Sequence, residues 1–313
     1  MDNVNSSKKR ILFIGIPDMA YVGLDGLLMS GVNVVGVLGP KKRHPMYYNF
    51  KRFVVARALN FIEYDELDET ELIETIKGLN VDLAVVCSFN YKIPKVLLNT
   101  TKDGFINVHP SLLPLYRGGN PYTNVLLNGE TETGVTIHFM DEGFDTGDII
   151  IQKKYPIHPK STMGTLFNEL NILGIELLLL VLKEYEKREL PRKKQPEGNF
   201  IKGNTLPESG LYIDYNKTAE DIEKFVRALN PFILASTMFR GNLMKIMKVE
   251  VASDTLCMPH PPGCVSKIED NKFFIATSKG LIAPTVLQFG NFFMGDAADF
   301  IRIVNPKIGE EFK

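Results

Sequence analysis

The sequence predicts an α/β protein of two domains, in which a mostly parallel sheet covered on both faces precedes a small β-barrel. Three observations lead to this prediction. Apolar, β-branched runs alternate with helical patterns in the first half, which is typical of a parallel sheet. Proline, glycine and basic residues interrupt all periodicity between residues 188 and 210. Short strand-like runs separated by glycine and polar turns follow that segment.

The elements of the first domain are expected where the hydrophobic period changes. Strands are expected at residues 10–15, 32–38, 61–64, 82–88 and 105–109, with helices at 19–30, at a stretch ending near 58, and at 69–79. Strands at 134–139 and 149–157 lead into a long helix that Ser161 or Thr162 can cap and that runs to about Lys187. We therefore place the first domain in residues 1–187 and an interdomain linker in 188–210.

The second domain is expected in residues 211–313. Thr218 begins a helix that ends near Leu229. The strands expected after it lie at 243–251, 263–268, 272–277 and 280–289. Short strands at this spacing indicate a small barrel with one or two helices. A chain of 313 residues is long enough for one large domain and one smaller domain.

Composition limits the possible functions. The chain carries 36 Lys and Arg against 37 Asp and Glu, which argues against a broad basic surface for nucleic acid. The start of the sequence has no signal-peptide pattern, and the most apolar run, residues 172–182, is too short to span a bilayer and contains Glu176. We therefore expect a cytoplasmic protein without a membrane partner.

Cysteine and histidine usage predicts no metal site. Cys87, Cys257 and Cys264 form no CxxC pair and are interpreted as small structural residues. The five histidines include no HExxH motif. The first strand is not followed by the GxGxxG spacing of dinucleotide-binding proteins, which disfavours a nicotinamide enzyme.

Three polar residues are the candidates for chemistry. Asn107 and His109 are two positions apart at the end of an expected strand, so their side chains share a face. Asp145 lies in a glycine-punctuated turn after a later strand and can reach His109 only through the fold. Acyl transfer to an amine needs donors for the developing oxyanion, each worth about 3 to 4 kcal/mol, and a group that takes the amine proton. Asn107, His109 and Asp145 together supply oxyanion binding, proton transfer and orientation of the imidazole.

Each residue also has a structural interpretation. An isolated Asn-x-His at a strand end is more often a hydrogen-bonded pair, and an isolated Asp in such a turn usually bonds its own backbone. Ser111 suggests a hydrolase, but the sequence has no GxSxG nucleophile elbow. His109, His138 and Asp145 can be imagined as metal ligands, but His138 sits in mid-strand and has no independent claim to that role.

A longer sequence pattern favours the catalytic interpretation of these residues over the structural one. Residues 107–121 (NVHPSLLPLYRGGNP) and 128–149 (NGETETGVTIHFMDEGFDTGDI) closely resemble the signature of the folate-dependent formyltransferases. That family includes enzymes acting on glycinamide ribonucleotide, methionyl-tRNA and amino sugars. Residues 13–20 and the tail, through 213–232 and 245–251, resemble the methionyl-tRNA enzymes in particular. The resemblance thus covers nearly the whole chain.

The resemblance implies a fold, a co-substrate and a set of site residues. It implies a Rossmann-like catalytic domain with an OB-like barrel, and 10-formyltetrahydrofolate as the formyl donor. It implies that Asn107, His109 and Asp145 are catalytic. The folate-contacting residues that it implies are Ser88, Phe89, Asn90, Tyr91, Lys92, Ile93, Asp141 and Gly143.

Local departures from the tRNA enzymes bear on the acceptor amine. The loop at 39–49 is shorter than theirs, and residues 118–124 read GGNPYTN where those enzymes favour another sequence. The loop at 88–94 and residues 203–215 resemble the amino-sugar formyltransferases more closely. We therefore expect a nucleotide-linked amino sugar as acceptor, with methionyl-tRNA as the alternative, because basic residues at 41–43 and 192–194 can meet tRNA phosphates. A formyltetrahydrofolate hydrolase is a weaker alternative, because the family's hydrolases resemble a regulatory domain placed before the catalytic one and we expect none before Arg10. A non-catalytic binding module is weaker as well, because all three catalytic positions are intact.

Overall fold

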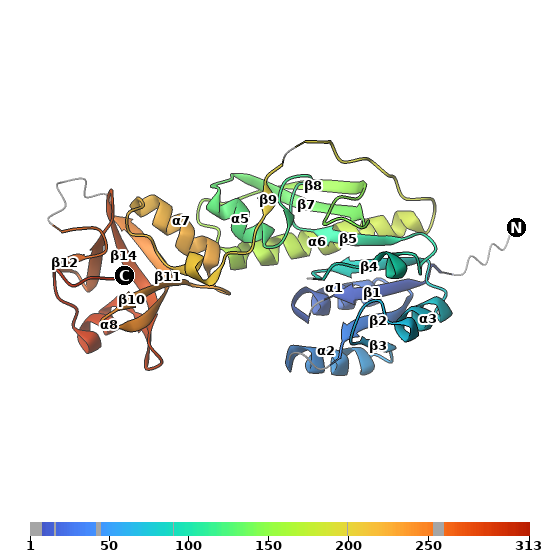
Figure 1. The fold of residues 1–313 in the computed structure, drawn as a ribbon, viewed down its shortest axis with the longest axis horizontal. Coiled ribbons are helices and arrows are strands. Elements are labelled where there is room, and N and C mark those ends of the chain that lie inside the picture. Colours follow the sequence, from blue (N-terminus) through green and yellow to red (C-terminus); the bar gives the residue numbers. More distant parts are fainter. Residues whose placement is uncertain (1–7, 16, 42–44, 90, 199, 253–259) are drawn as a thin grey trace, which may run out of the picture. The chain divides into compact units, whose positions relative to one another are not determined.

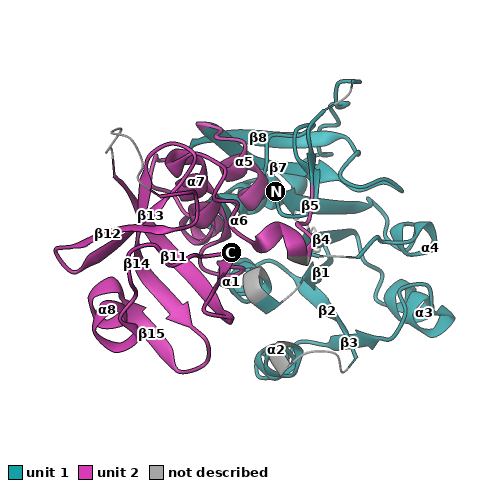
Figure 2. Ribbon diagram, turned by 60° about the vertical axis from the view of Figure 1, so that its left-hand side comes forward, with its two compact units in different colours: residues 1–121, 132–156, 169–203 teal, residues 122–131, 157–168, 204–313 magenta. Residues whose placement is uncertain are grey.

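The computed structural model describes residues 8–15, 17–41, 45–89, 91–198, 200–252 and 260–313. The chain divides into two compact units (Figure 2). The first contains residues 1–121, 132–156 and 169–203, and the second contains residues 122–131, 157–168 and 204–313. Each unit is described separately below.

A seven-stranded sheet forms the centre of the first unit (Figure 1). Its strands are β1 (Ile11–Gly15), β2 (Val34–Pro40), β3 (Phe61–Tyr64), β4 (Leu83–Cys87), β5 (Phe105–His109), β7 (Glu132–Phe139) and β8 (Ile149–Pro156). The order is β3-β2-β1-β4-β5-β7-β8, and the first five strands are parallel. The β5–β7 and β7–β8 pairs are antiparallel. The prediction of a mostly parallel sheet is confirmed.

Helices cover both faces of this sheet. The helices are α1 (Pro17–Met29), α2 (Pro45–Val55), α3 (Thr70–Gly78), α4 (Lys95–Leu98) and α6 (Met163–Tyr185). Leu72, Ile73 and Ile76 of α3 pack with Leu12 and other alternate strand residues in one hydrophobic core. On the other face, α1 contacts β1 and β4 closely enough that Gly23 lies directly over the ring of Phe13. Phe105 belongs to the α3 face, so Asn107 and His109 point to that same side.

The long helix α6 begins within the second unit and continues in the first. Its 23 residues are long and apolar enough to cross a bilayer, but 56% of its most apolar window is buried inside the protein. The sequence argument that this apolar segment is too short does not hold for the whole helix. Burial of its side chains, including Leu170, Leu173, Leu178 and Val181, explains its apolar composition instead.

The second unit is built on an antiparallel sheet with the order β10-β11-β14-β13-β12, to which β15 pairs along β14. The strands are β10 (Ala235–Phe239), β11 (Asn242–Ala252), β12 (Val265–Glu269), β13 (Lys272–Ala276), β14 (Leu281–Phe289) and β15 (Phe293–Asp296). This unit also contains α5 (Pro121–Leu127, from Tyr122 onward), α7 (Ala219–Leu229), α8 (Ala297–Val304) and the short 3-10 helix η1 (Glu208–Leu211). The strands β10 and β15 and the helices α5 and α8 were not anticipated from the sequence.

The two edges of this antiparallel sheet are joined by the residues at positions 311–313. Phe312 forms a bridge to Phe239 of β10, and Glu311 forms a bridge to Cys264, next to β12. The Phe312 ring stacks on Phe239 at 4.4 Å between centroids. The sheet therefore closes on itself, as the predicted barrel requires.

Candidate active site

The carboxyl end of β5 carries two of the candidate residues. The β5–β7 register places Asn107 opposite His138, and His109 opposite Thr136. His109 is 4% exposed and Asn107 is half-buried. Beyond His109 the chain turns, and Ser111 stabilises the turn by donating to the Leu115 carbonyl at 2.7 Å. A rigid strand therefore holds both side chains in place.

Asp145 is brought to these residues by the loop between β7 and β8. Its Oδ1 accepts a hydrogen bond from Asn107 Nδ2 at 3.2 Å, and its Oδ2 accepts one from the Gly118 backbone at 2.9 Å. Oδ2 also lies 3.5 Å from His109 Nδ1. The structure thus brings Asn107, His109 and Asp145 together, although Asp145 is far from the other two in sequence.

His138 is a fourth member of this cluster, and the sequence interpretation gave it no role. Its Nε2 lies 3.3 Å from Asp145 Oδ1 and 3.3 Å from Asn107 Nδ2. Its Nδ1 is 2.7 Å from the Phe139 carbonyl, which can only accept, so Nδ1 carries the proton. Nε2 is the ring nitrogen that faces both Asn107 and Asp145. The side chain was missed because its neighbours depend on the strand register.

The same reasoning assigns the protons of His109. Its Nε2 lies 3.0 Å from the Tyr116 carbonyl, so Nε2 carries a proton and donates to that oxygen. In the neutral ring Nδ1 is therefore unprotonated and faces the Asp145 carboxylate. A proton that arrives at Nδ1 is placed directly against a negative charge. This nitrogen is thus suited to accept a proton during a reaction.

The surroundings of the cluster lower the pKa of both His109 and Asp145. Burial lowers the pKa of His109 and His138 lowers it further, which outweighs the raising effects of Asp145 and the Tyr116 carbonyl. Burial raises the pKa of Asp145, but His109, His138 and the Gly118 N–H together bring this pKa well below its ordinary value. Near neutral pH the cluster therefore contains a neutral imidazole beside a carboxylate.

Among the described residues, no group of three or more His, Cys, Asp or Glu side chains is arranged to hold a metal ion. In the described part of the cluster, His109 and His138 both already use one ring nitrogen on a backbone carbonyl. The remaining nitrogens face Asp145 from two sides. This arrangement suits proton transfer around one carboxylate.

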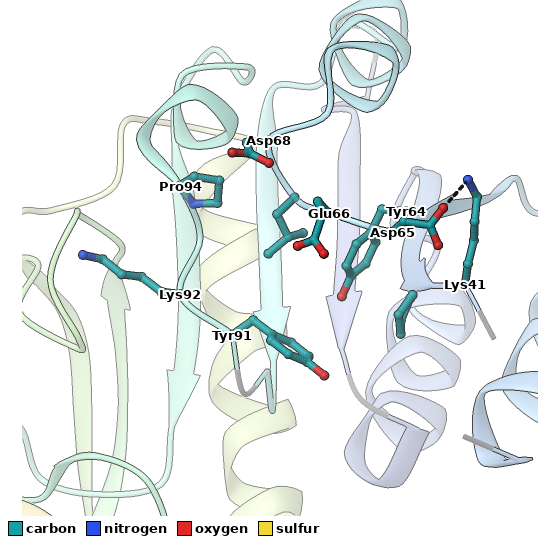
Figure 3. A pocket seen from close by; sticks show the side chains of 10 residues that line it. Lys41, Tyr64, Asp65, Glu66, Asp68, Tyr91, Lys92 and Pro94 are labelled. Carbon is teal, nitrogen blue, oxygen red and sulfur yellow. Dashed lines mark hydrogen bonds and ion pairs between the residues drawn. The ribbon is translucent and has the colours of Figure 1, made fainter. Parts of the chain in front are cut away.

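The loop after β4 carries most of the folate-contacting residues implied by the sequence. Ile93 is buried, Ser88 and Phe89 are half-buried, and Tyr91 is exposed, with its ring 5.4 Å from that of Phe89. Asn90 lies outside the described residues. Tyr91 and Lys92 line a cavity of about 300 Å³ together with residues at the ends of β2 and β3 (Figure 3).

The same cavity has aromatic and charged walls. Tyr64 of β3 and Tyr91 of the loop after β4 both line it, and Lys41 forms an ion pair with Asp65 at 3.0 Å (Figure 3). Glu66 and Asp68 also line it. The catalytic candidates Asn107, His109 and Asp145 do not line this cavity.

Asp141 and Gly143, the other two residues for which the resemblance implies folate contact, line a separate cavity of about 420 Å³. Asp141 Oδ1 accepts from the Gly143 N–H at 2.9 Å and from Thr146 Oγ1 at 2.6 Å, which shapes the loop that carries Asp145. Phe105 and Met140 add apolar surface to this cavity.

A glutamine from the expected linker also reaches the site. Gln195 Nε2 lies 2.8 Å from the Asp145 carbonyl and 2.8 Å from the Gly147 carbonyl. Its Oε1 accepts from both Nε and Nη2 of Arg117. The composition of residues 188–210 gave no sign of these contacts. Its proline and glycine content is typical of a linker, although the segment pairs with the first unit.

Comparison with known proteins identifies the family. Residues 30–182 match the formyl transferase family and residues 207–305 match its C-terminal domain. The methionyl-tRNA formyltransferase of Syntrophus aciditrophicus is 32% identical over 302 residues, which cover 95% of this chain and 96% of that enzyme. That of Pelotomaculum thermopropionicum is 34% identical over 304 residues, covering 94% and 95%. The chain belongs to the formyltransferase family.

Solved structures share the fold of this formyltransferase. WlaRD, described as a sugar 3N-formyl transferase, has a TM-score of 0.66 at 21% identity and covers 92% of this chain and all of its own. HypX from Aquifex aeolicus, in complex with tetrahydrofolic acid, has a TM-score of 0.65 at 18% identity. It covers 97% of this chain, which spans 49% of HypX.

The predictions of family, activity and co-substrate are confirmed. The protein is a formyltransferase that takes the formyl group from 10-formyltetrahydrofolate. The proteins that it resembles include methionyl-tRNA formyltransferases and an N-formyltransferase from Helicobacter canadensis whose structure contains dTDP-3-aminofucose.

Proposed function

We propose that this formyltransferase acts on the amino group of methionyl-tRNA and works in the cytoplasm. The observation that supports this acceptor is the extent of the match. Several methionyl-tRNA formyltransferases are 30% or more identical over at least 94% of this chain, through both the catalytic and the C-terminal domain. This acceptor replaces the amino sugar favoured by the local sequence features, because those features involve only short segments of the chain.

The proposed chemistry uses the cluster around Asp145. When bound, 10-formyltetrahydrofolate supplies a formyl carbon activated for attack by the amine. Asn107 binds the formyl oxygen through the amide N–H that it does not donate to Asp145, which stabilises the negative charge that develops on that oxygen. His109 receives the proton released from the attacking nitrogen at Nδ1, directly or through one water, and this proton passes to the tetrahydrofolate nitrogen as the bond between that nitrogen and the formyl carbon breaks. Asp145 stabilises the resulting imidazolium from 3.5 Å.

Exposed basic residues support a polynucleotide acceptor. Lys193 and Lys194 are exposed and directly precede Gln195, which bonds the backbone of Asp145. Phosphates bound by these two lysines would thus lie next to the segment that contacts Asp145. Each lysine–phosphate contact releases counterions, so binding of such an acceptor depends steeply on salt.

A nucleotide-linked amino sugar is the second candidate. The shortened 39–49 segment favours it, and Lys41 is already paired with Asp65 rather than free for a phosphate backbone. Lys42 and Arg43, which the sequence interpretation grouped with Lys41, lie outside the described residues. A sugar nucleotide presents two phosphates and is held mainly by pocket contacts, so its binding depends weakly on salt.

Release of tetrahydrofolate by the purified protein tests the two acceptors. The assay is run with initiator methionyl-tRNA, with nucleotide-linked amino sugars, and with no amine. We expect turnover with methionyl-tRNA, with a KM that rises steeply between about 50 and 200 mM salt. Turnover with sugar nucleotides alone would overturn the proposed acceptor, and equal release without amine would indicate a hydrolase.

A pair of variants sharpens this test. Lys193→Ala combined with Lys194→Ala should raise the KM for methionyl-tRNA and flatten its salt dependence. Lys77→Ala is the matched control, because Lys77 is also an exposed lysine but pairs with Glu74 on α3. An unchanged KM in the double variant would remove these lysines from tRNA binding.

A further inference from the structure

Residues 193–198 and 200–203, here called the strap, run along the first unit and pair with it at both ends. At one end, Lys193 exchanges two backbone hydrogen bonds with Ile149, the first residue of β8, at 2.8 and 3.0 Å. At the other end, β9 (Lys202–Gly203) pairs in parallel with β6 (Arg117–Gly118). The strap therefore joins the strand that follows the Asp145 loop to the segment that follows the β5 turn.

Gln195 lies between these two ends and is fully engaged. Its amide nitrogen donates to two carbonyls of the catalytic loop, those of Asp145 and Gly147. Its amide oxygen accepts from Arg117 at 3.0 and 2.6 Å, so the guanidinium fixes the orientation of the amide. One side chain thus uses both donor hydrogens and its acceptor on this site.

The backbone of Asp145 needs such support. Its φ is +55°, in the left-handed region that residues with a side chain rarely adopt. A backbone in this region persists only where its surroundings fix it. The Gln195 amide bonds the Asp145 carbonyl directly, and therefore helps to set where the carboxylate points.

The β9 end of the strap holds the backbone groups that hydrogen-bond His109 and Asp145. The Tyr116 N–H donates to the Ile201 carbonyl at 2.6 Å, while the Tyr116 carbonyl accepts from His109. Arg117 and Gly118 pair with the strap, while the Gly118 N–H donates to Asp145. A side chain at position 203 would collide with the Gly119 carbonyl, so glycine permits this close pairing.

We propose that Gln195, oriented by Arg117, is a positioning residue for formyl transfer. It holds Asp145 at the distance from His109 that stabilises the protonated imidazole, and it does so without touching either substrate. The strap is thus a structural part of the catalytic centre. This inference rests on the proposed roles of His109 and Asp145, and on no particular acceptor.

Three variants test the inference in the full-length protein. Gln195→Ala removes both donors and the acceptor, whereas Gln195→Glu keeps the size and the acceptor for Arg117 but turns an oxygen toward two carbonyls. Arg117→Lys keeps the charge and loses the two-pronged contact. The control is Gln288→Ala, because Gln288 is also half-buried and donates its amide to a loop carbonyl, that of Gly290, in the second unit.

Both Gln195 variants should lower kcat by about 10- to 100-fold, the usual scale for a residue that orients a catalytic group. The Kd for tetrahydrofolate should change by less than about twofold, since a lost transition-state interaction leaves ground-state binding intact. Arg117→Lys should lie between the wild type and the Gln195 variants. Gln288→Ala should keep the wild-type kcat.

The pH profile distinguishes positioning from a purely structural role. Asp145 raises the pKa of His109, so a displaced Asp145 lets that pKa fall. The acidic limb of the kcat profile should therefore move to lower pH in the Gln195 variants. A loss of stability alone would lower the active fraction and leave the limb where it is.

Each outcome can be read against Asp145→Asn. If Asp145→Asn abolishes turnover while Gln195→Ala and Gln195→Glu keep the wild-type kcat and pH profile, the role of Gln195 is overturned and those of His109 and Asp145 stand. If Asp145→Asn itself is fully active, the proposed chemistry fails first. If Gln195→Ala does not fold, Gln195→Glu and Arg117→Lys decide by the same two readouts.

Discussion

The charge of Asp145 can be removed with little change of shape by the substitution Asp145→Asn. Oδ2 lies 3.5 Å from His109 Nδ1, so at an effective dielectric constant of about 20 the carboxylate attracts an imidazolium by about 5 kcal/mol. The Asp145 side chain is 14% exposed, and solvent screening reduces this value. About 3 to 4 kcal/mol of transition-state stabilisation, or a 10²- to 10³-fold fall in kcat, is the expected loss.

Hydrogen bonding adds to this loss. The two carboxylate oxygens accept from Asn107 and from the Gly118 backbone. An asparagine has one accepting oxygen, so its amide group must face one of these two donors. Because of this mismatch, we expect a fall in kcat near the 10³-fold end of the range.

The measurement is tetrahydrofolate release at saturating acceptor, with the Kd for tetrahydrofolate determined separately on the same preparation. We expect kcat to fall and the Kd to stay within about threefold, because the charge acts on the transition state. Equal losses of kcat and folate affinity would mean that Asp145 mainly shapes the folate pocket. A kcat near the wild-type value would refute the electrostatic reasoning.

Three other predictions follow from the described contacts. His109→Ala should lower turnover at least about 100-fold while the protein still folds, which circular dichroism and the release assay can check together. The protein should lose stability as the pH falls, first below about 6.5, where the unfolded chain protonates the imidazole that burial keeps neutral, and again below about 4, where it protonates the Asp145 carboxyl. Urea midpoints at pH 7.5 and 5.5 test the first step, which should shrink in His109→Ala. Thr218→Ala should destabilise the protein by about 1 kcal/mol, because Thr218 Oγ1 caps α7 by accepting from the Asp221 N–H at 3.1 Å, and thermal unfolding measures this loss.

The sequence predicted those parts of the fold that depend on local periodicity. Strand β3 has the expected bounds, and β5 does as well, which placed Asn107 and His109 on one face because side chains alternate along any strand. The helix expected from Thr218 to about Leu229 is also present, as α7, with Thr218 as its N-cap. By contrast, β10 and β15 are short strands whose pairing partners are distant in the chain, and no local pattern marked them.

The parts of the site that depend on long-range pairing could not be predicted. His138 joins the cluster because β5 and β7 align it with Asn107, and a shift of one residue would turn it to the other face. Gln195 reaches Asp145 because the strap pairs with β8 at Ile149. A linker-like composition does not indicate whether a segment is free or paired, so the sequence was interpreted as an interdomain connection.

The closing pairs of the second unit have a consequence for synthesis. Residues 311–313 join β10 to the end of β12, and the Met238 N–H donates to the Lys313 carbonyl at 2.6 Å. The aromatic core around Phe239 and Phe273 also includes Phe312. During translation the barrel therefore stays open until residue 313 has left the ribosome, whereas the seven-stranded sheet has all its strands once residue 156 has emerged. The catalytic sheet can thus form while the edges of the barrel are still exposed and most vulnerable to aggregation.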